Sequence, residues 1–131
     1  MSRRVPASMR RELQKRARHR CEYCLVHERD AIFGHEPDHV LSKRHAGETT
    51  LLNLAWACFD CNRLKSCDLS SIDLKTGRVV RLFNPRRDLW RKHFRLRLGR
   101  IIPLTAIGRA TEYFLQLNRK DAIDSRLRPT N

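Results

Sequence analysis

The sequence predicts one small α+β domain, and three observations support this fold class. The chain has 131 residues, which allows one domain or one domain with a tail. About 40% of the residues are apolar and 32% are charged, so a core can form, although a thin one. Short apolar runs typical of strands alternate with segments of helical periodicity, and none approaches the roughly 20 residues of a membrane span.

The cysteines predict how so small a domain is held together. Four of the five form two C-x2-C pairs, Cys21 with Cys24 and Cys58 with Cys61, and Cys67 is left over. Two such pairs supply four thiolates, enough for a tetrahedral zinc site without an open position. Disulfides are the alternative, but the odd number of cysteines and the lack of a secretory signal argue against them. Zinc would clamp the two ends of the 33-residue insert between the pairs.

The charge distribution indicates the class of partner. The chain carries 28 basic and 14 acidic residues, a net charge of +14, and arginine outnumbers lysine. Arginine suits bidentate recognition of phosphate. Residues 1–20 and 86–100 are strongly basic, whereas the charged residues within 22–38 are nearly all acidic. Basic flanks around an acidic pocket suit a metal-dependent enzyme that acts on a polyanion, and an ordinary solvated surface is the alternative.

Hydrophobic periodicity predicts the elements of the first half of the chain. Residues 6–19 are expected to be helical, because Val5, Met9, Leu13 and Ala17 recur at a spacing of four. Further along, the pattern predicts extended segments over 25–33 and 37–41, a compact apolar segment over 54–59 and a helix over 60–65.

The second half is expected to contain two strands and two helices. Turn chemistry at residues 74–77 precedes a strand over 79–83, followed by a helix over 88–98 and an extended segment over 101–104. Thr105 is expected to cap a last helix. The buried stripe of that helix would comprise Ile107, Ala110, Phe114 and Leu117. The domain would thus span 1–131, with a motif core at about 19–66, a C-terminal extension at about 78–123 and a flexible tail over 124–131.

A group of polar residues lies between the two cysteine pairs. Because neighbours in a strand point to opposite faces, Asp38 and His39 cannot share one role. Asp38 is a hard oxygen ligand that suits a divalent cation, and His39 suits the deprotonation of water near neutral pH. Phosphodiester hydrolysis needs both a base and a cation. Asn62, at the start of a helix, could supply a second oxygen ligand for Mg²⁺ or Mn²⁺.

The whole pattern resembles the HNH nucleases. It consists of two zinc knuckles, Asp38-His39, Asn53-Leu54 and the run from Cys61 to Lys65, and it covers roughly residues 19–66. The resemblance implies a ββα-metal (His-Me finger) core, clamped by the four-cysteine zinc site and joined by flanking helices. It implies that His39 is the general base, with Nδ1–H held by the Asn53 carbonyl and Nε2 free to face the water. Asp38 and Asn62 would hold the catalytic cation.

One position departs from the commonest family pattern. Asn62 stands where many members carry histidine, so the motif is an HNN variant. An amide oxygen favours Mg²⁺ or Mn²⁺ over softer cations and binds the metal more weakly.

Several further residues are candidates with simpler alternatives. Glu36 shares the strand face of Asp38, and His45 lies in the following loop, so either could act in a second shell around the site. Arg63 and Lys65, about one turn beyond Asn62, are placed to contact phosphate. A solvated surface position is the alternative for each of them. Trp56 and Phe59 are expected to pack in the core beneath the zinc.

These features together predict a metal-dependent endonuclease that hydrolyses DNA, with low or partner-supplied sequence specificity. The expected cofactors are structural Zn²⁺ and catalytic Mg²⁺ or Mn²⁺. We expect duplex DNA as partner, no membrane association, a monomer or weak dimer, and a cytoplasmic location. The alternative is a zinc-containing nucleic-acid-binding module without catalysis. The joint presence of Asp38, His39, Asn53 and Asn62 favours the enzyme, because a pure binding module has no use for that set.

Overall fold

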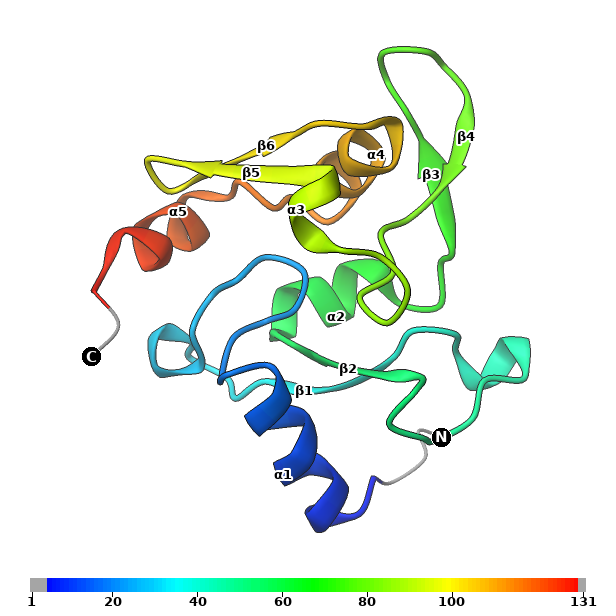
Figure 1. Ribbon diagram of the computed structural model, residues 1–131, viewed down its shortest axis with the longest axis vertical. Coiled ribbons are helices and arrows are strands. Elements are labelled where there is room, and N and C mark those ends of the chain that lie inside the picture. The colour runs from blue at the N-terminus through cyan, green and yellow to red at the C-terminus, as the bar shows by residue number, and fades with distance from the viewer. Residues whose placement is uncertain (1–4, 130–131) are drawn as a thin grey trace.

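The computed structural model describes residues 5–129 and has an α+β fold, as predicted (Figure 1). The strands form three antiparallel pairs, β1 with β2, β3 with β4 and β5 with β6. Within residues 5–129, no helix combines the length and the hydropathy needed to cross a membrane. In chain order the elements are α1 (Ala7–Arg16), η1 (Glu28–Asp30), β1 (Glu36–His39), η2 (Lys43–His45), β2 (Leu54–Ala57), α2 (Phe59–Lys65), β3 (Ser70–Ile72), β4 (Val79–Arg81), α3 (Trp90–His93), β5 (Phe94–Arg97), β6 (Arg100–Pro103), α4 (Ala106–Phe114) and α5 (Lys120–Leu127).

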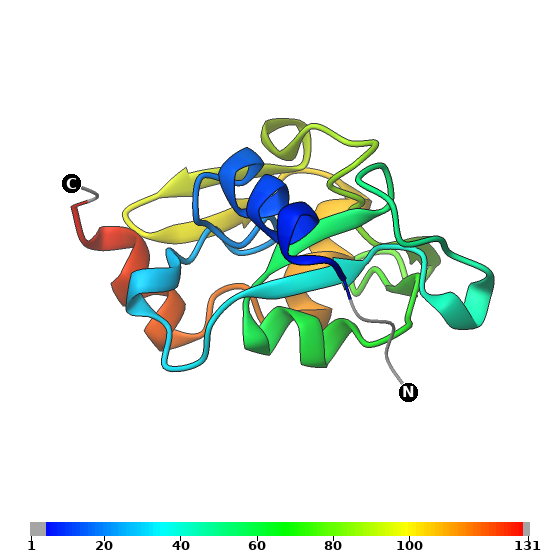
Figure 2. The ribbon, with the colours of Figure 1, turned by 90° about the horizontal axis from the view of Figure 1, so that it is seen from below.

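Helix α1 packs on one face of the β1–β2 hairpin. Its Leu13 is fully buried against Leu54 and Trp56 of β2, and Met9 and Ala17 flank this contact. The spacing of four that predicted the helix therefore corresponds to a real buried face. Figure 2 shows α1 on one side of the hairpin and α2 on the other.

The β1–β2 register separates the two central polar residues. Asp38 pairs with Ala55, and His39 pairs with Leu54, which faces α1. Because cross-strand partners share a face, His39 lies on the α1 side and Asp38 on the α2 side. Strand alternation thus gives the two side chains different surroundings, as the sequence predicted.

The C-terminal extension folds over the α2 side and completes the main core. Phe83, Phe94 and Leu115 are buried in one cluster with the four paired cysteines. Helix α4 is anchored to the β3–β4 turn by Arg109, whose guanidinium donates to both carboxylate oxygens of the fully buried Asp73 (2.8 and 3.0 Å). This guanidinium holds the pKa of Asp73 well below its usual range. The predicted cap of α4 is confirmed, because the Thr105 hydroxyl accepts a hydrogen bond from the Gly108 amide.

The helix predicted over residues 88–98 is wrong beyond its first turn. Only Trp90–His93 is helical, and the chain continues as strand β5, which pairs with β6 in a hairpin. Charged and apolar residues alternate with a period of two along β5, which favours a strand. Leu98 and Gly99 both have positive φ (50° and 81°), and they turn the chain back into β6.

The predicted flexible tail is also wrong for residues 124–127. They belong to α5, whose Ser125 is buried and donates a hydrogen bond to Asp30 Oδ2 (2.7 Å). Arg126 donates from Nε to the carbonyl oxygen of Cys24 (2.8 Å). Because polar contacts hold this segment, hydrophobic periodicity did not indicate helix α5 in the sequence. Residues 130 and 131 lie outside the described part of the chain. Residues 25–33, predicted as extended, contain instead the short helix η1.

Candidate functional site

The four paired cysteines come together as a metal-binding cluster. All four side chains are buried, and their Sγ atoms lie within 4.8 Å of one another. A zinc–sulfur distance of about 2.3 Å places tetrahedral ligands about 3.8 Å apart, and Cys24 Sγ lies 3.6 Å from Cys58 Sγ. This separation is far too long for a disulfide. The cluster therefore fits structural zinc, and Cys67 lies outside it.

Backbone N–H groups support both zinc knuckles, the first formed by Cys21 and Cys24 and the second by Cys58 and Cys61. The amide of Cys24 donates to Cys21 Sγ (3.5 Å), and the amide of Cys61 donates to Cys58 Sγ (3.3 Å). Cys58 also precedes α2 directly as its cap. A metal in the cluster would therefore fix the start of α2 relative to the first knuckle.

An arginine of the C-terminal extension completes the surroundings of the cluster. Arg119 Nη2 donates to Cys58 Sγ (3.3 Å) and to Cys24 Sγ (3.5 Å), and its Nε lies 3.4 Å from Asp60 Oδ2. Four thiolates around Zn²⁺ carry a net charge of −2, so a guanidinium beside the sulfur atoms stabilises the loaded site. Arg119 thereby links the start of α5 to the clamp.

We expect Arg119→Ala to lower zinc affinity by about 10- to 100-fold, the range typical for groups that support metal ligands. Competition with a chromogenic zinc chelator measures this change. Lys120→Ala is the matched control. It removes the positive charge next to Arg119 in the sequence, and in the described contacts the Lys120 side chain pairs only with Asp124. Equal zinc affinity of Arg119→Ala and the parent would contradict this role.

Asp38 lies buried between the first knuckle and α2. Its Oδ2 accepts a hydrogen bond from the Tyr23 hydroxyl (2.7 Å) and lies 3.5 Å from Lys65 Nζ. Burial raises the pKa of Asp38 above its ordinary value, although Lys65 and Tyr23 both oppose the shift. The predicted cation ligand is thus one member of a buried group of three.

Lys65 occupies a different place from the one predicted for it. Its side chain is 2% exposed, and Nζ donates to the carbonyl oxygen of His39 (3.3 Å) as well as pairing with Asp38. A buried ammonium requires such partners, because an unpaired charge in a core is costly. Lys65 therefore joins α2 to β1 instead of standing ready for phosphate.

The surroundings of His39 also differ in one respect from the expectation. His39 Nε2, expected to face water, lies 2.9 Å from Thr49 Oγ1. The Asn53 amide makes three hydrogen bonds to the loop backbone: Oδ1 accepts from Leu41 N (2.9 Å), and Nδ2 donates to Leu41 O and Glu48 O (2.8 Å each). The orientation of His39 by Asn53 therefore stays a prediction.

The loop that Asn53 holds depends on a close backbone approach at Gly47. A Cβ atom at this position would lie 1.6 Å from Leu41 O and 2.9 Å from Asn53 Nδ2. Only glycine fits there. Gly47 and Asn53 thus close the connection between β1 and β2.

The remaining predicted residues lie around the two motif elements. Asn62 is half-buried on α2, three residues before Lys65. Arg63 is exposed, with its guanidinium 5.8 Å from the centre of the Phe59 ring. Glu36 is exposed at the start of β1, and exposed His45 has Nε2 3.2 Å from the carbonyl oxygen of Cys67. The structure brings Asp38 and α2 together but leaves Glu36 and His45 at the periphery.

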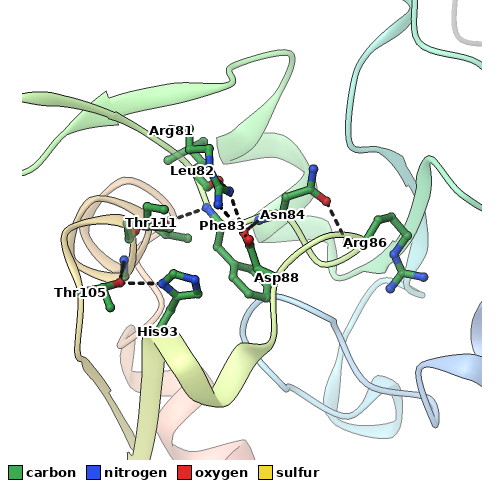
Figure 3. A network of polar contacts seen from close by, with 11 residues as sticks. Arg81, Leu82, Phe83, Asn84, Arg86, Asp88, His93, Thr105 and Thr111 are labelled. Atoms are coloured by element: carbon green, nitrogen blue, oxygen red, sulfur yellow. Dashed lines mark hydrogen bonds and ion pairs between the residues drawn. The ribbon is translucent and has the colours of Figure 1, made fainter.

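A cleft of about 420 Å³ separates the hairpin end from the extension. Asn53 and Lys65 line its motif side. The opposite wall is the segment from Arg81 to Arg87, which is tied down by the contacts of Figure 3. There the Asp88 carboxylate accepts two hydrogen bonds from the Arg81 guanidinium and one from the backbone N–H of Asn84, at 2.7 to 2.9 Å. Three cations that line the cleft are paired with acids: Lys65 with Asp38, Arg81 with Asp88 and Arg86 with Glu22.

Sequence reasoning missed three residues that contact the predicted site. Tyr23 lies inside the first C-x2-C pair, and the sequence signal available was an aromatic residue between two expected zinc ligands. Thr49 lies in the loop after the Asp-His pair, and no local pattern distinguishes it from its neighbour Thr50. Arg119 is 95 residues from Cys24, so no motif includes it.

Fold and site together define a ββα domain with a four-cysteine metal clamp. The model of the family described as HNH endonuclease matches residues 21–67. The match covers just over a third of the chain, and it begins at Cys21, the first ligand of the cysteine cluster. Helix α1 and the whole C-terminal extension lie outside the match. No curated protein and no solved structure matches the chain.

Proposed function

We propose that the protein is a metal-dependent endonuclease that hydrolyses DNA phosphodiester bonds to 3′-hydroxyl and 5′-phosphate ends. An HNH domain indicates nuclease activity in general. The observation that carries the proposal for this chain is the β1–β2 register, which separates Asp38 from His39 while α2 contacts Asp38 through Lys65. The proposed base and the proposed oxygen ligand are thus consecutive residues of β1, one on each face of the hairpin.

In the proposed reaction, His39 removes a proton from the attacking water. The Thr49 hydroxyl lies 2.9 Å from Nε2 of His39. In the reaction the attacking water would either displace this hydroxyl from Nε2 or be held by it. Asn53 keeps the loop that carries Thr49 closed against the hairpin. Zn²⁺ in the cysteine cluster would act only on structure, because four thiolates leave no open coordination position.

Asp38 and Asn62 are the oxygen donors that would hold Mg²⁺ or Mn²⁺, and their chemistry fits these hard cations. Such an ion would stabilise the charge that develops on the phosphate and on the departing oxygen. Lys65 already neutralises part of the Asp38 charge. We therefore expect weak cation binding at this site.

The basic surface supports DNA as the polyanionic substrate. Arg95, Arg97 and Arg100 are exposed on the β5–β6 hairpin, and α1 exposes Arg11 and Lys15. Such side chains neutralise phosphates without reading sequence, so we propose low or partner-supplied specificity. A monomer or weak dimer in the cytoplasm, without membrane association, is part of the same proposal.

One observation favours a second candidate function, a DNA-binding module without catalysis. Lys65 and Thr49 lie beside Asp38 and His39, at the places where the mechanism needs a cation and a water. In such a module these contacts would be permanent.

Relaxation of supercoiled plasmid by the zinc-loaded protein tests the choice between these functions. We expect nicked or linear product only when Mg²⁺ or Mn²⁺ is added, with ends that a ligase can rejoin. Plasmid that is bound, as judged by a mobility shift, but stays supercoiled over a wide range of Mg²⁺ concentration would favour the binding module.

A further inference from the structure

The loop before β1 exposes two large apolar side chains to solvent. Ile32 is 95% exposed and Phe33 is 57% exposed. Phe59, which the sequence placed in the core beneath the zinc, is 39% exposed on α2 and contacts Phe33. That prediction is therefore wrong for Phe59, although Trp56 is buried as expected. Single exposed apolar residues are common on proteins, but a contiguous group points to a binding surface.

The rings form an ordered surface with a cation at its edge. The centres of Phe33 and Phe59 lie 4.7 Å apart at an interplanar angle of 37°, and the Arg63 guanidinium lies 5.8 Å from the centre of the Phe59 ring. We call Ile32, Phe33, Phe59 and Arg63 the aromatic platform.

The loop that carries the platform is anchored at both ends. On one side, Asp30 accepts a hydrogen bond from Ser125 of α5 (2.7 Å). On the other side, His35 is 3% exposed, with Nε2 2.8 Å from the carbonyl oxygen of Val26. These anchors fix the backbone on both sides of Ile32 and Phe33, and the contact with Phe59 orients the Phe33 ring, so a ligand would meet a partly preorganised surface.

The platform adjoins the proposed cation site. Phe59, Asn62 and Arg63 stand at positions i, i+3 and i+4 of α2, and residues at these spacings share one face of a helix. A DNA strand whose phosphate reached Asn62 would therefore carry its next bases past Phe59 and Phe33.

We propose that the aromatic platform stacks an unpaired nucleobase of the substrate strand next to the cleaved phosphate. The proposal rests on the proposed function for its substrate class. Aromatic rings beside an arginine are the surface on which proteins stack bases of single-stranded nucleic acid, without strong sequence preference. A second copy of the chain is a poor occupant, because it would bring another net charge of +14 toward Arg63.

The test measures binding without cleavage, so that it does not depend on catalysis. Zinc-loaded protein without Mg²⁺ is titrated into a labelled single-stranded oligonucleotide and into the same backbone with abasic residues. We expect Phe33→Ala to weaken binding of the normal strand by about 5- to 150-fold and to change binding of the abasic strand little. Phe33→Trp should retain normal binding. Because Phe33 is more than half exposed, these variants should keep the zinc content of the parent.

Leu74→Ala is the matched control, because Leu74 is similarly exposed (62%) on the β3–β4 turn. It should bind both strands as the parent does. Equal losses of Phe33→Ala on both strands, no loss on either, or no binding of single strands by the parent would each overturn the proposal. So would a parent dimer, seen by sedimentation, that Phe33→Ala dissociates. Stacking without plasmid cleavage would refute the endonuclease alone, and cleavage without stacking would refute the platform alone.

Discussion

Replacing Cys58 and Cys61 together by alanine is expected to unfold the protein. The change removes two of four buried zinc ligands at the point where β2 enters α2. Structural zinc contributes on the order of 10 kcal/mol of apparent binding energy. A whole domain is usually stable by only about 5 to 15 kcal/mol. Circular dichroism and elemental analysis should therefore show loss of helical signal together with loss of one zinc per chain.

Cys67→Ala provides the control for this experiment, because Cys67 is a cysteine outside the cluster. It should keep both the zinc and the parent unfolding midpoint. A folded Cys58→Ala/Cys61→Ala protein, or a parent purified without chelator that contains no zinc, would contradict the structural role of the metal.

His39→Ala is expected to lose about 10²- to 10⁴-fold in kcat, the range typical of general-base catalysis, while its Kd for DNA changes little. His39 lies at the end of β1 opposite Leu54, on the side of the hairpin away from the zinc cluster. Its removal should therefore spare the zinc content and the fold. Single-turnover cleavage and a mobility shift on the same plasmid separate the two quantities.

His45→Ala is the matched control for His39→Ala, since His45 is an exposed histidine of the same connection and contacts only the Cys67 carbonyl oxygen in the described contacts. It should cleave at close to the parent rate. If His45→Ala lost activity while His39→Ala kept it, the base would be assigned to the wrong residue.

Local patterns predicted the parts of the site that lie close together in sequence. The C-x2-C spacing identified the four cysteines, and both pairs indeed converge on one cluster. The spacing of apolar residues predicted α1, and strand alternation predicted the separate surroundings of Asp38 and His39. In each case the local geometry depends on residues that are close together in the sequence.

Long-range polar contacts could not be predicted in this way. The Asp38 carboxylate, 3.5 Å away, offsets part of the cost of burying Lys65, yet the sequence position of Lys65 one turn beyond Asn62 suggested an exposed phosphate contact. Arg119 and Ser125 connect α5 to the first half of the chain through a few hydrogen bonds and an ion pair. Such contacts need only one side chain from a helix, so they leave no periodic pattern in the sequence.

The pH dependence of single-turnover plasmid cleavage by the zinc-loaded parent and by His39→Ala tests the central claim most directly. Only a neutral imidazole can accept a proton from water. The parent rate should therefore rise with pH as the imidazole loses its proton and then level off, whereas the residual rate of His39→Ala should lack that rise. The same rise in both proteins would show that another group activates the water.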